Sequence, residues 1–134
     1  MRITNAIINI TSDNPERLTA FYRDTVGLGP QPEQGEGALQ VVPGLTLHVN
    51  GHSETHGQTK EPHRVLLDFF VEDVAAEEVR LKSQGVAFIR EQGVEWWGGV
   101  ISTFTDPDGN YCQIIQYDPS RATANPEEAA VATA

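Results

Sequence analysis

Two polar side chains in this 134-residue chain stand where they could do chemistry. Asp68 lies mid-strand between Leu67 and Phe69, so its carboxylate must be solvated by a cavity, be paired, or have its pKa raised. It could anchor a cationic or hydroxyl-bearing ligand or act as a base; alternatively it is hydrogen-bonded to a neighbouring Asn or His and is structural. His48 is more often such a structural residue, but near Asp68 it could be a general base.

A pair of tryptophans offers a second kind of chemistry. Trp96 and Trp97 are adjacent, and on a strand adjacent side chains face opposite sides. One ring could then pack in the core while the other stacks against a planar or cationic ligand. Core packing of both rings is the alternative. The histidines of the polar segment 51–63 have no helical spacing, and we interpret them as surface residues.

The first half of the chain contains the elements of one β-α-β-β-β module. A β-branched run over 3–11 predicts a strand, and Asn14-Pro15-Glu16 is a typical helix start. The helix should run to about Thr25 and stop at Gly27. Residues 29–37 form a loop with at most one short edge strand, and 38–42 and 45–50 form a hairpin around Pro43-Gly44. Module one therefore covers 3–50.

The same order of elements repeats after a polar linker at 51–63. We expect a strand over 64–71, a helix over 74–84 ended by Gly85, and strands over 86–91, 99–105 and 111–117. The last two strands flank the turn Asp106-Pro107-Asp108-Gly109-Asn110. Module two thus covers 64–117, and both modules form a single domain over 1–117. The tail 118–134 has no periodic apolar face and is predicted to be disordered.

Strand alternation predicts which side chains turn away from the helices. Ile8, Leu67 and Cys112 belong to the helix-facing core, and their sequence neighbours point to the other face. Apolar walls with a few directional polar groups are the usual composition of an organic-ligand site. The residues predicted to bind ligand are Ile7, Asn9, His48, Asp68, Phe70, Trp96, Trp97, Tyr111 and Gln113.

Composition limits the partners and the compartment. A net charge of −10, from 9 basic and 19 acidic residues, makes nucleic acid and anionic membranes poor partners. No apolar run approaches the ~20 residues of a membrane span, and no signal peptide is recognisable. The only cysteine, Cys112, is expected to be a small buried residue, so neither a disulfide nor a cysteine-based metal site is possible. We expect a cytoplasmic protein.

Three stretches together resemble the vicinal oxygen chelate superfamily, which includes glyoxalase I, extradiol dioxygenases and bleomycin-resistance proteins. They are 14–28, from Asn14-Pro15-Glu16 to Val26-Gly27-Leu28; 70–86, from Phe70 to Val86; and the DPDGN turn with its strand. The resemblance implies an α+β fold in which two tandem modules form an incomplete barrel around a concave site. It also implies a homodimer.

Metal-dependent members of that superfamily hold a divalent ion with four side chains, mostly His and Glu. Counted along the resemblance, their positions fall on Ile7, His48, Leu66 and Gln113. Two of these are alkyl groups and Gln113 is a neutral amide, a feeble ligand. Slipping either strand by one residue restores no histidine. We therefore expect no metal site and no cofactor.

The function predicted on these grounds is the binding or sequestering of a small organic molecule of cationic or aromatic, antibiotic-like character, as in bleomycin resistance. The resemblance leaves a second interpretation open, a glyoxalase-like lyase or isomerase, or a metal-free acid–base enzyme that uses His48 and Asp68. A third is a structural or regulatory partner domain. The sequence identifies neither the ligand nor a reaction.

Overall fold

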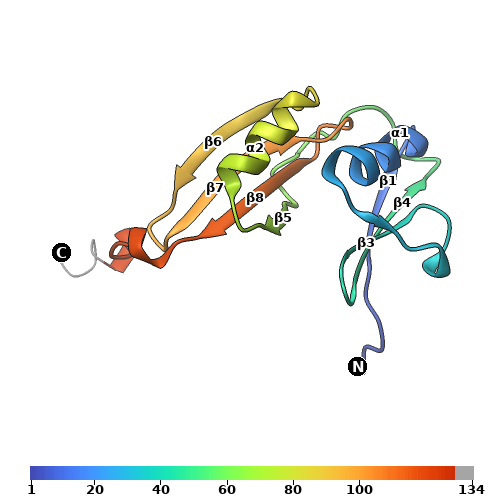
Figure 1. Cartoon of the computed structure of the whole chain (residues 1–134). Helices are drawn as coiled ribbons and strands as arrows, with labels where there is room; N and C mark the ends of the chain where they lie inside the picture. Colours follow the sequence, from blue (N-terminus) through green and yellow to red (C-terminus); the bar gives the residue numbers. More distant parts are fainter. Residues whose placement is uncertain (129–134) are drawn as a thin grey trace. The chain divides into compact units, whose positions relative to one another are not determined.

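The computed structural model describes residues 1–128, and its chain divides into two compact units (Figure 1). Unit 1 comprises Met1–Lys60 and the turn Asp106–Gly109; unit 2 comprises Glu61–Thr105 and residues 110–128 of the described chain. Each unit has one four-stranded mixed sheet, open at both edges, and helical segments. The predicted α+β class and the two tandem β-α-β-β-β modules are therefore confirmed.

The sheet of unit 1 has the order β1-β4-β3-β2. Its centre is β4, which pairs in parallel with β1 and antiparallel with β3. The predicted hairpin is confirmed, and the loop before it contains one short edge strand, as expected. The strands are β1 Ile8–Ser12, β2 Gly29–Pro30, β3 Ala38–Val42 and β4 Leu45–Gly51.

The predicted first strand, 3–11, begins too early, because β1 starts at Ile8. Its partner β4 begins at Leu45, directly after the hairpin turn, so the residues before about position 6 have no strand beside them. An edge strand gains no second partner on its other side. Ile3 is accordingly 71% exposed.

The predicted helix of module one starts and stops as expected but changes geometry halfway. The α-helix α1 covers Pro15–Ala20, with the Asn14 side chain accepting from the Arg17 backbone N–H at 3.2 Å. It continues as a π-helix, η1 Phe21–Val26, and stops at Gly27, where φ is 98°. The last turn widens because the N–H of Gly27 donates to the Tyr22 carbonyl, five residues back.

The DPDGN segment forms the predicted turn, and its first four residues belong to unit 1. The buried Asp106 carboxylate accepts from the Tyr22 hydroxyl at 2.6 Å and from the Asp108 backbone N–H at 2.9 Å. Arg17 pairs with Asp108 at 2.9 Å. These bonds join the turn to the helical segment of unit 1, so the turn is part of that unit's framework.

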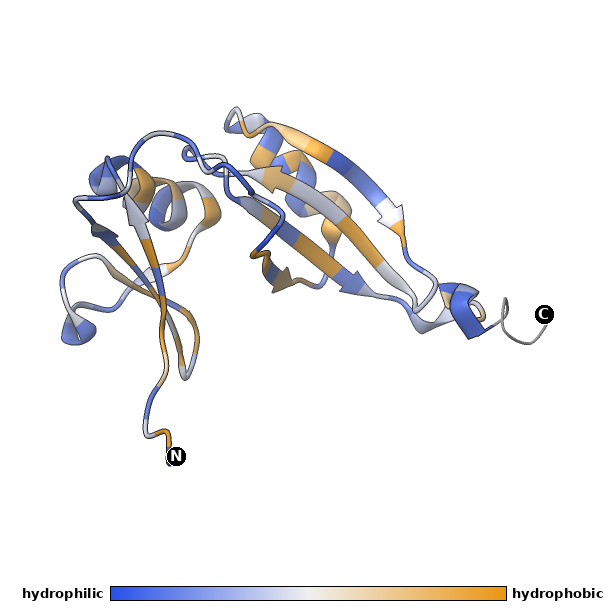
Figure 2. Cartoon of the chain, turned by 180° about the vertical axis from the view of Figure 1, so that it is seen from behind, coloured by the Kyte–Doolittle hydropathy of each residue, from blue (hydrophilic) through white to orange (hydrophobic). Residues whose placement is uncertain are grey.

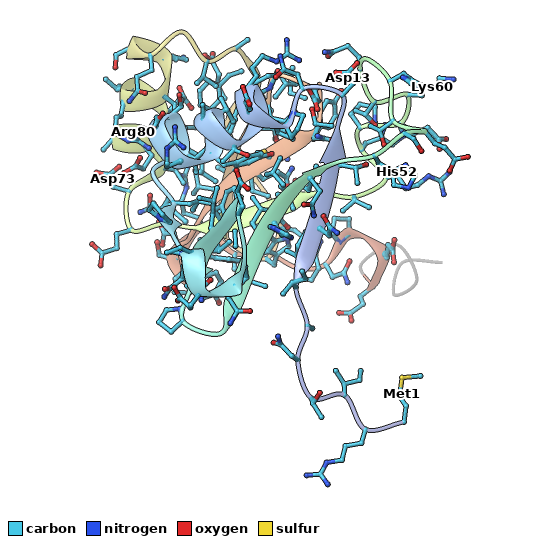
Figure 3. All side chains as sticks on the ribbon, turned by 90° about the vertical axis from the view of Figure 1, so that its right-hand side faces the viewer. Met1, Asp13, His52, Lys60, Asp73 and Arg80 are labelled. Carbon is cyan, nitrogen blue, oxygen red and sulfur yellow. The ribbon has the colours of Figure 1, made fainter. Side chains whose placement is uncertain are left out.

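A polar loop, 52–60, follows β4 within unit 1 (Figure 3). The Thr55 hydroxyl bonds the Thr11 hydroxyl at 2.7 Å, and the Gly57 backbone N–H donates to the Asp13 carboxylate at 2.6 Å. His52 and His56 are exposed, in agreement with their interpretation as surface residues.

Unit 2 repeats the arrangement with the order β5-β8-β7-β6. Its helix α2, Val74–Ser83, lies across one face of the sheet (Figure 1), capped by Asp73 and stopped at Gly85. The strands of unit 2 carry both apolar and polar residues (Figure 2), and burial alternates over the first four residues of β8, as expected for a strand with one face under a helix. The strands are β5 Leu67–Phe70, β6 Phe88–Val94, β7 Gly99–Thr105 and β8 Tyr111–Tyr117.

A buried polar network joins α2 to this sheet. The Ser102 hydroxyl donates to Glu78 at 2.5 Å and accepts from the Gln92 backbone N–H at 2.9 Å. Lys82 pairs with the same carboxylate at 3.1 Å. These partners outweigh the effect of burial, which alone would raise the pKa, and they hold the pKa of Glu78 below its ordinary value.

Two strands of unit 2, β5 and β6, differ from the prediction at both ends. β5 is shorter than the predicted 64–71, because only residues 67–70 pair with β8. β6 runs to Val94, three residues beyond the predicted end, since bulges at two places in its pairing with β7 carry it past the expected turn. Gln92, with φ 46°, lies within this irregular stretch.

The segment after β8 forms a short 3-10 turn, η3 Pro119–Arg121, capped by Asp118. Backbone bonds tie this segment to the β6–β7 turn: Asp118 N–H donates to the Gly98 carbonyl at 2.8 Å, and Thr123 N–H to the Trp96 carbonyl at 2.6 Å. Residues 129–134 lie outside the described residues. Disorder of the tail 118–134 as a whole stays a prediction.

Candidate ligand-binding face

The candidate site is the face of the unit 2 sheet that points away from α2. Glu78 on α2 bonds Ser102, so the residues alternating with Ser102 on β7 turn to the opposite side. Strand register then shows which side chains share that side. On the side away from α2, each of four β7 residues lies opposite one β8 residue. The pairs are Gly99 with Tyr117, Ile101 with Ile115, Thr103 with Gln113, and Thr105 with Tyr111. On β5 they are Asp68 and Phe70, opposite Gln113 and Ile115. We call this set the open face.

An aromatic shelf lies at one end of the open face. The Trp97 ring stacks on the Tyr117 ring, with centroids 6.4 Å apart and planes inclined by 21°. A side chain on Gly99 would collide with the Trp97 ring, so the ring occupies the space that a side chain there would fill. Glycine at 99 therefore allows the indole to lie against the backbone of β7.

A polar row crosses the open face at the other end. The row runs across all four strands, and each residue is in register with the next. In order they are Asp68 on β5, Gln113 on β8, Thr103 on β7 and Arg90 on β6. The Gln113 amide nitrogen donates to the Thr103 hydroxyl oxygen at 3.1 Å. Arg90 pairs with Glu95 at 2.8 Å, so its charge is already neutralised.

Asp68 is the charged group of this row without a partner. Within residues 1–128 no side chain bonds or pairs with its carboxylate. Partial burial raises its pKa above the ordinary value, because desolvation disfavours the charged form. Its strand neighbour Phe70 is 68% exposed. A carboxylate beside an exposed aromatic ring is thus available to a ligand.

Trp96 and Trp97 are not on a strand, contrary to the prediction that they occupy opposite faces of one. They lie in the β6–β7 turn, closed by the bond from the Gly98 N–H to the Glu95 carbonyl at 2.9 Å. The bulges that lengthen β6 place the turn here. Trp97 reaches the open face, whereas Trp96 is 41% exposed.

Unit 1 has an equivalent row, formed by Asn9 on β1 and His48 on β4, which are in register. Its polar atoms bond one another: Asn50 donates to Asn9 Oδ1 at 2.8 Å and to His48 Nδ1 at 3.0 Å. The other ring nitrogen, Nε2, donates to the Glu36 carbonyl at 2.7 Å. Ile7, on the same side of β1, is 45% exposed.

This network defines what His48 can do. Nδ1 bonds the Asn50 amide and Nε2 bonds the Glu36 carbonyl, so both ring nitrogens are engaged. To act as a base, or to bind a metal, it would have to lose one of these bonds. His48 belongs to unit 1 and Asp68 to unit 2. The two hydrogen bonds of the ring therefore support a structural role for His48.

The divalent ion implied by the resemblance does not suit the residues at its four positions. Ile7 and Leu66 offer no donor atom, the Gln113 amide bonds Thr103, and the His48 nitrogens are both engaged. Within residues 1–128, no three His, Cys, Asp or Glu side chains are grouped so that they could hold a metal ion. We derive no metal chemistry from this donor set.

Thr103, Tyr117 and Arg90 are among the residues of the face or its border that the predicted ligand residues did not include. Alternation along 111–117 already places Tyr117 on the side of Gln113, and the glycine at the start of 99–105 was a signal of close approach. Arg90 had no such signal, because the bulges in β6 break the alternation that would have predicted its side.

A model of the Glyoxalase/Bleomycin resistance protein/Dioxygenase superfamily matches residues 5–114, so the chain belongs to that superfamily. Comparison with curated proteins gives no match. No helix within residues 1–128 has the length and apolarity to cross a membrane.

Solved structures with this fold include one that is described as binding an antibiotic. TnmS3, an antibiotic binding protein from Streptomyces sp. CB03234, is 27% identical at a TM-score of 0.62, with 88% of this chain and 99% of that chain covered. A superfamily enzyme from Burkholderia phytofirmans PsJN is 19% identical (TM-score 0.68, coverage 84% and 97%). The integron cassette protein VCH_CASS1 from V. cholerae is 20% identical (TM-score 0.67, coverage 88% and 98%).

Proposed function

We propose that this superfamily member binds and sequesters a small organic molecule on the open face of unit 2. The observation that carries the proposal is the shared face of the Trp97–Tyr117 shelf and the unpaired Asp68 carboxylate. An aromatic platform with few directional polar groups suits an organic ligand. The antibiotic-binding protein TnmS3 has the same fold, which supports an antibiotic-like ligand and a role in resistance.

Binding without turnover is favoured over acid–base catalysis. Both nitrogens of His48 are engaged, and in the polar row of unit 2 the Asp68 carboxylate stands beside the Gln113 amide, which cannot exchange a proton as an acid or base. A sequestering protein needs only affinity. Tyr111, on the same face of unit 2, would extend the contact surface in this proposal. Asn9 and Ile7 belong to unit 1 and stay sequence predictions.

Tryptophan fluorescence tests the proposal directly. Planar aromatic antibiotics should quench the emission of the protein saturably and be recovered chemically unchanged. Trp97→Phe should abolish most of the ligand-induced quenching and weaken binding, whereas Trp96→Phe should retain both, because only Trp97 stacks on the open face. Equal effects of the two variants, or a product detected by mass spectrometry, would contradict the proposal.

A homodimer is part of the proposal. Phe70 and Leu66 expose apolar surface on and beside β5, an edge strand, and unit 1 does the same with Ile7. Light scattering at micromolar concentration should give twice the mass of one chain. A cytoplasmic location, expected from the sequence, would be tested by cell fractionation.

A further inference from the structure

The polar row presents hydrogen-bond acceptors to a ligand and almost no free donors. The Gln113 amide nitrogen is turned toward Thr103, to which it donates at 3.1 Å. Its amide oxygen is therefore the atom turned away from Thr103. In register beside it on β5 stands the unpaired Asp68 carboxylate. Neighbouring strands lie about 4.8 Å apart, so the two acceptors are within reach of a single ligand group.

We propose that Asp68 and Gln113 form an acceptor pair that binds a cationic nitrogen group with several N–H donors: an amidinium, a guanidinium or a primary ammonium. This inference rests on the proposed function and names the ligand class of that face. A carboxylate and an amide oxygen side by side repel an anion and offer nothing to a carbonyl. A charged N–H donor makes bonds about twice as strong as a neutral one.

The other two residues of the polar row, Arg90 and Thr103, do not make it a binding site for an anion. Arg90, at its far end, pairs with Glu95 at 2.8 Å, and the Thr103 hydroxyl, which could donate, is on a buried residue. The net charge of −10 also raises the local concentration of cations. Both factors favour a cationic group over an anionic one.

The shelf and the acceptor pair set the length of the ligand. Tyr117 and Gln113 are four residues apart on β8, about 13 Å along a strand. Ile115 and Ile101, which lie between them in register, are buried at 3% and 6% exposure. The ligand is therefore elongated, with a planar part at Trp97 and the cationic group at Asp68.

Two commercial probes with one ring system test this assignment: the bis-amidine 4′,6-diamidino-2-phenylindole and the uncharged 2-phenylindole. We expect the amidine to bind the full-length protein more tightly. Asp68→Asn should weaken amidine binding about tenfold or more, and Gln113→Leu about fivefold. Glu72→Gln, the same charge change at an exposed site outside the row, should leave it within about twofold. Affinity for 2-phenylindole should not change in any variant.

Any other result contradicts either the acceptor pair alone or the open face as a binding site. Equal affinity of the two probes, or equal losses in Asp68→Asn and Glu72→Gln, would overturn the acceptor pair while leaving the proposed function intact, provided that 2-phenylindole binds. If neither probe binds the wild-type protein, the acceptor pair and the open face as a binding site both fall. A melting curve for each variant shows that the fold is retained.

Discussion

Replacing Ser102 by alanine should destabilise unit 2 far more than a serine-to-alanine change usually does. The hydroxyl is fully buried, donates to the Glu78 carboxylate at 2.5 Å and accepts from the Gln92 N–H at 2.9 Å. Losing a hydrogen bond to a charged group costs about 1.5–3 kcal/mol, and the part-buried bond from the Gln92 N–H is lost as well. We therefore expect a loss of about 2–4 kcal/mol.

The measurement is urea unfolding followed by circular dichroism at pH 7. Ser83→Ala is the matched control. Ser83 is an exposed residue on α2, the helix that carries Glu78, and its hydroxyl donates to the Arg80 carbonyl at 2.6 Å. The control should lose less than about 1 kcal/mol. A loss below about 1 kcal/mol for Ser102→Ala would refute the view that this network holds α2 on the sheet.

The same variant should change the dependence of stability on pH. In the wild type the pKa of Glu78 is lowered on folding, so its contribution is present above the unfolded-state pKa and is lost as pH falls through the lower folded-state pKa. Removing Ser102 removes one cause of the lowering. The acid-side loss of stability should then be shallower than in the wild type. An unchanged slope between neutral and acidic pH would contradict this reasoning.

Three further outcomes are expected. Asp68→Asn should raise the melting temperature at neutral pH, because burial raises the pKa of Asp68 and penalises its charged form; the gain should fade as pH drops through that folded-state pKa. Gly98→Ala should cost more stability than Gly27→Ala: both sites have positive φ, but only at Gly98 would the new Cβ collide with the Asp118 carbonyl. Protein stripped and refilled with Ni²⁺ or Zn²⁺ should retain no stoichiometric metal by elemental analysis, and one tightly bound ion per chain would overturn the absence of a metal site.

The sequence by itself determined the elements and their two faces. Strong local signals did this: the Asn14-Pro15 start and Gly27 stop of the first helix, the hairpin turn at Pro43-Gly44, and the turn at 106–110 all lie where predicted. Alternation along β8 placed Cys112 in the core and Gln113 on the other side. Such signals involve residues close in the chain, so they can be read without the fold.

Tertiary structure alone decided what the candidate residues touch. The bonds that saturate His48 come from Glu36 and Asn50, and the first of these is twelve residues away in a loop without a periodic pattern. The bulges of β6 shifted the tryptophans from a strand into a turn, where Trp97 meets Tyr117. Asp68 was left unpaired beside Gln113 by strand register. Pairing between distant strands sets these contacts, and no local periodicity encodes it.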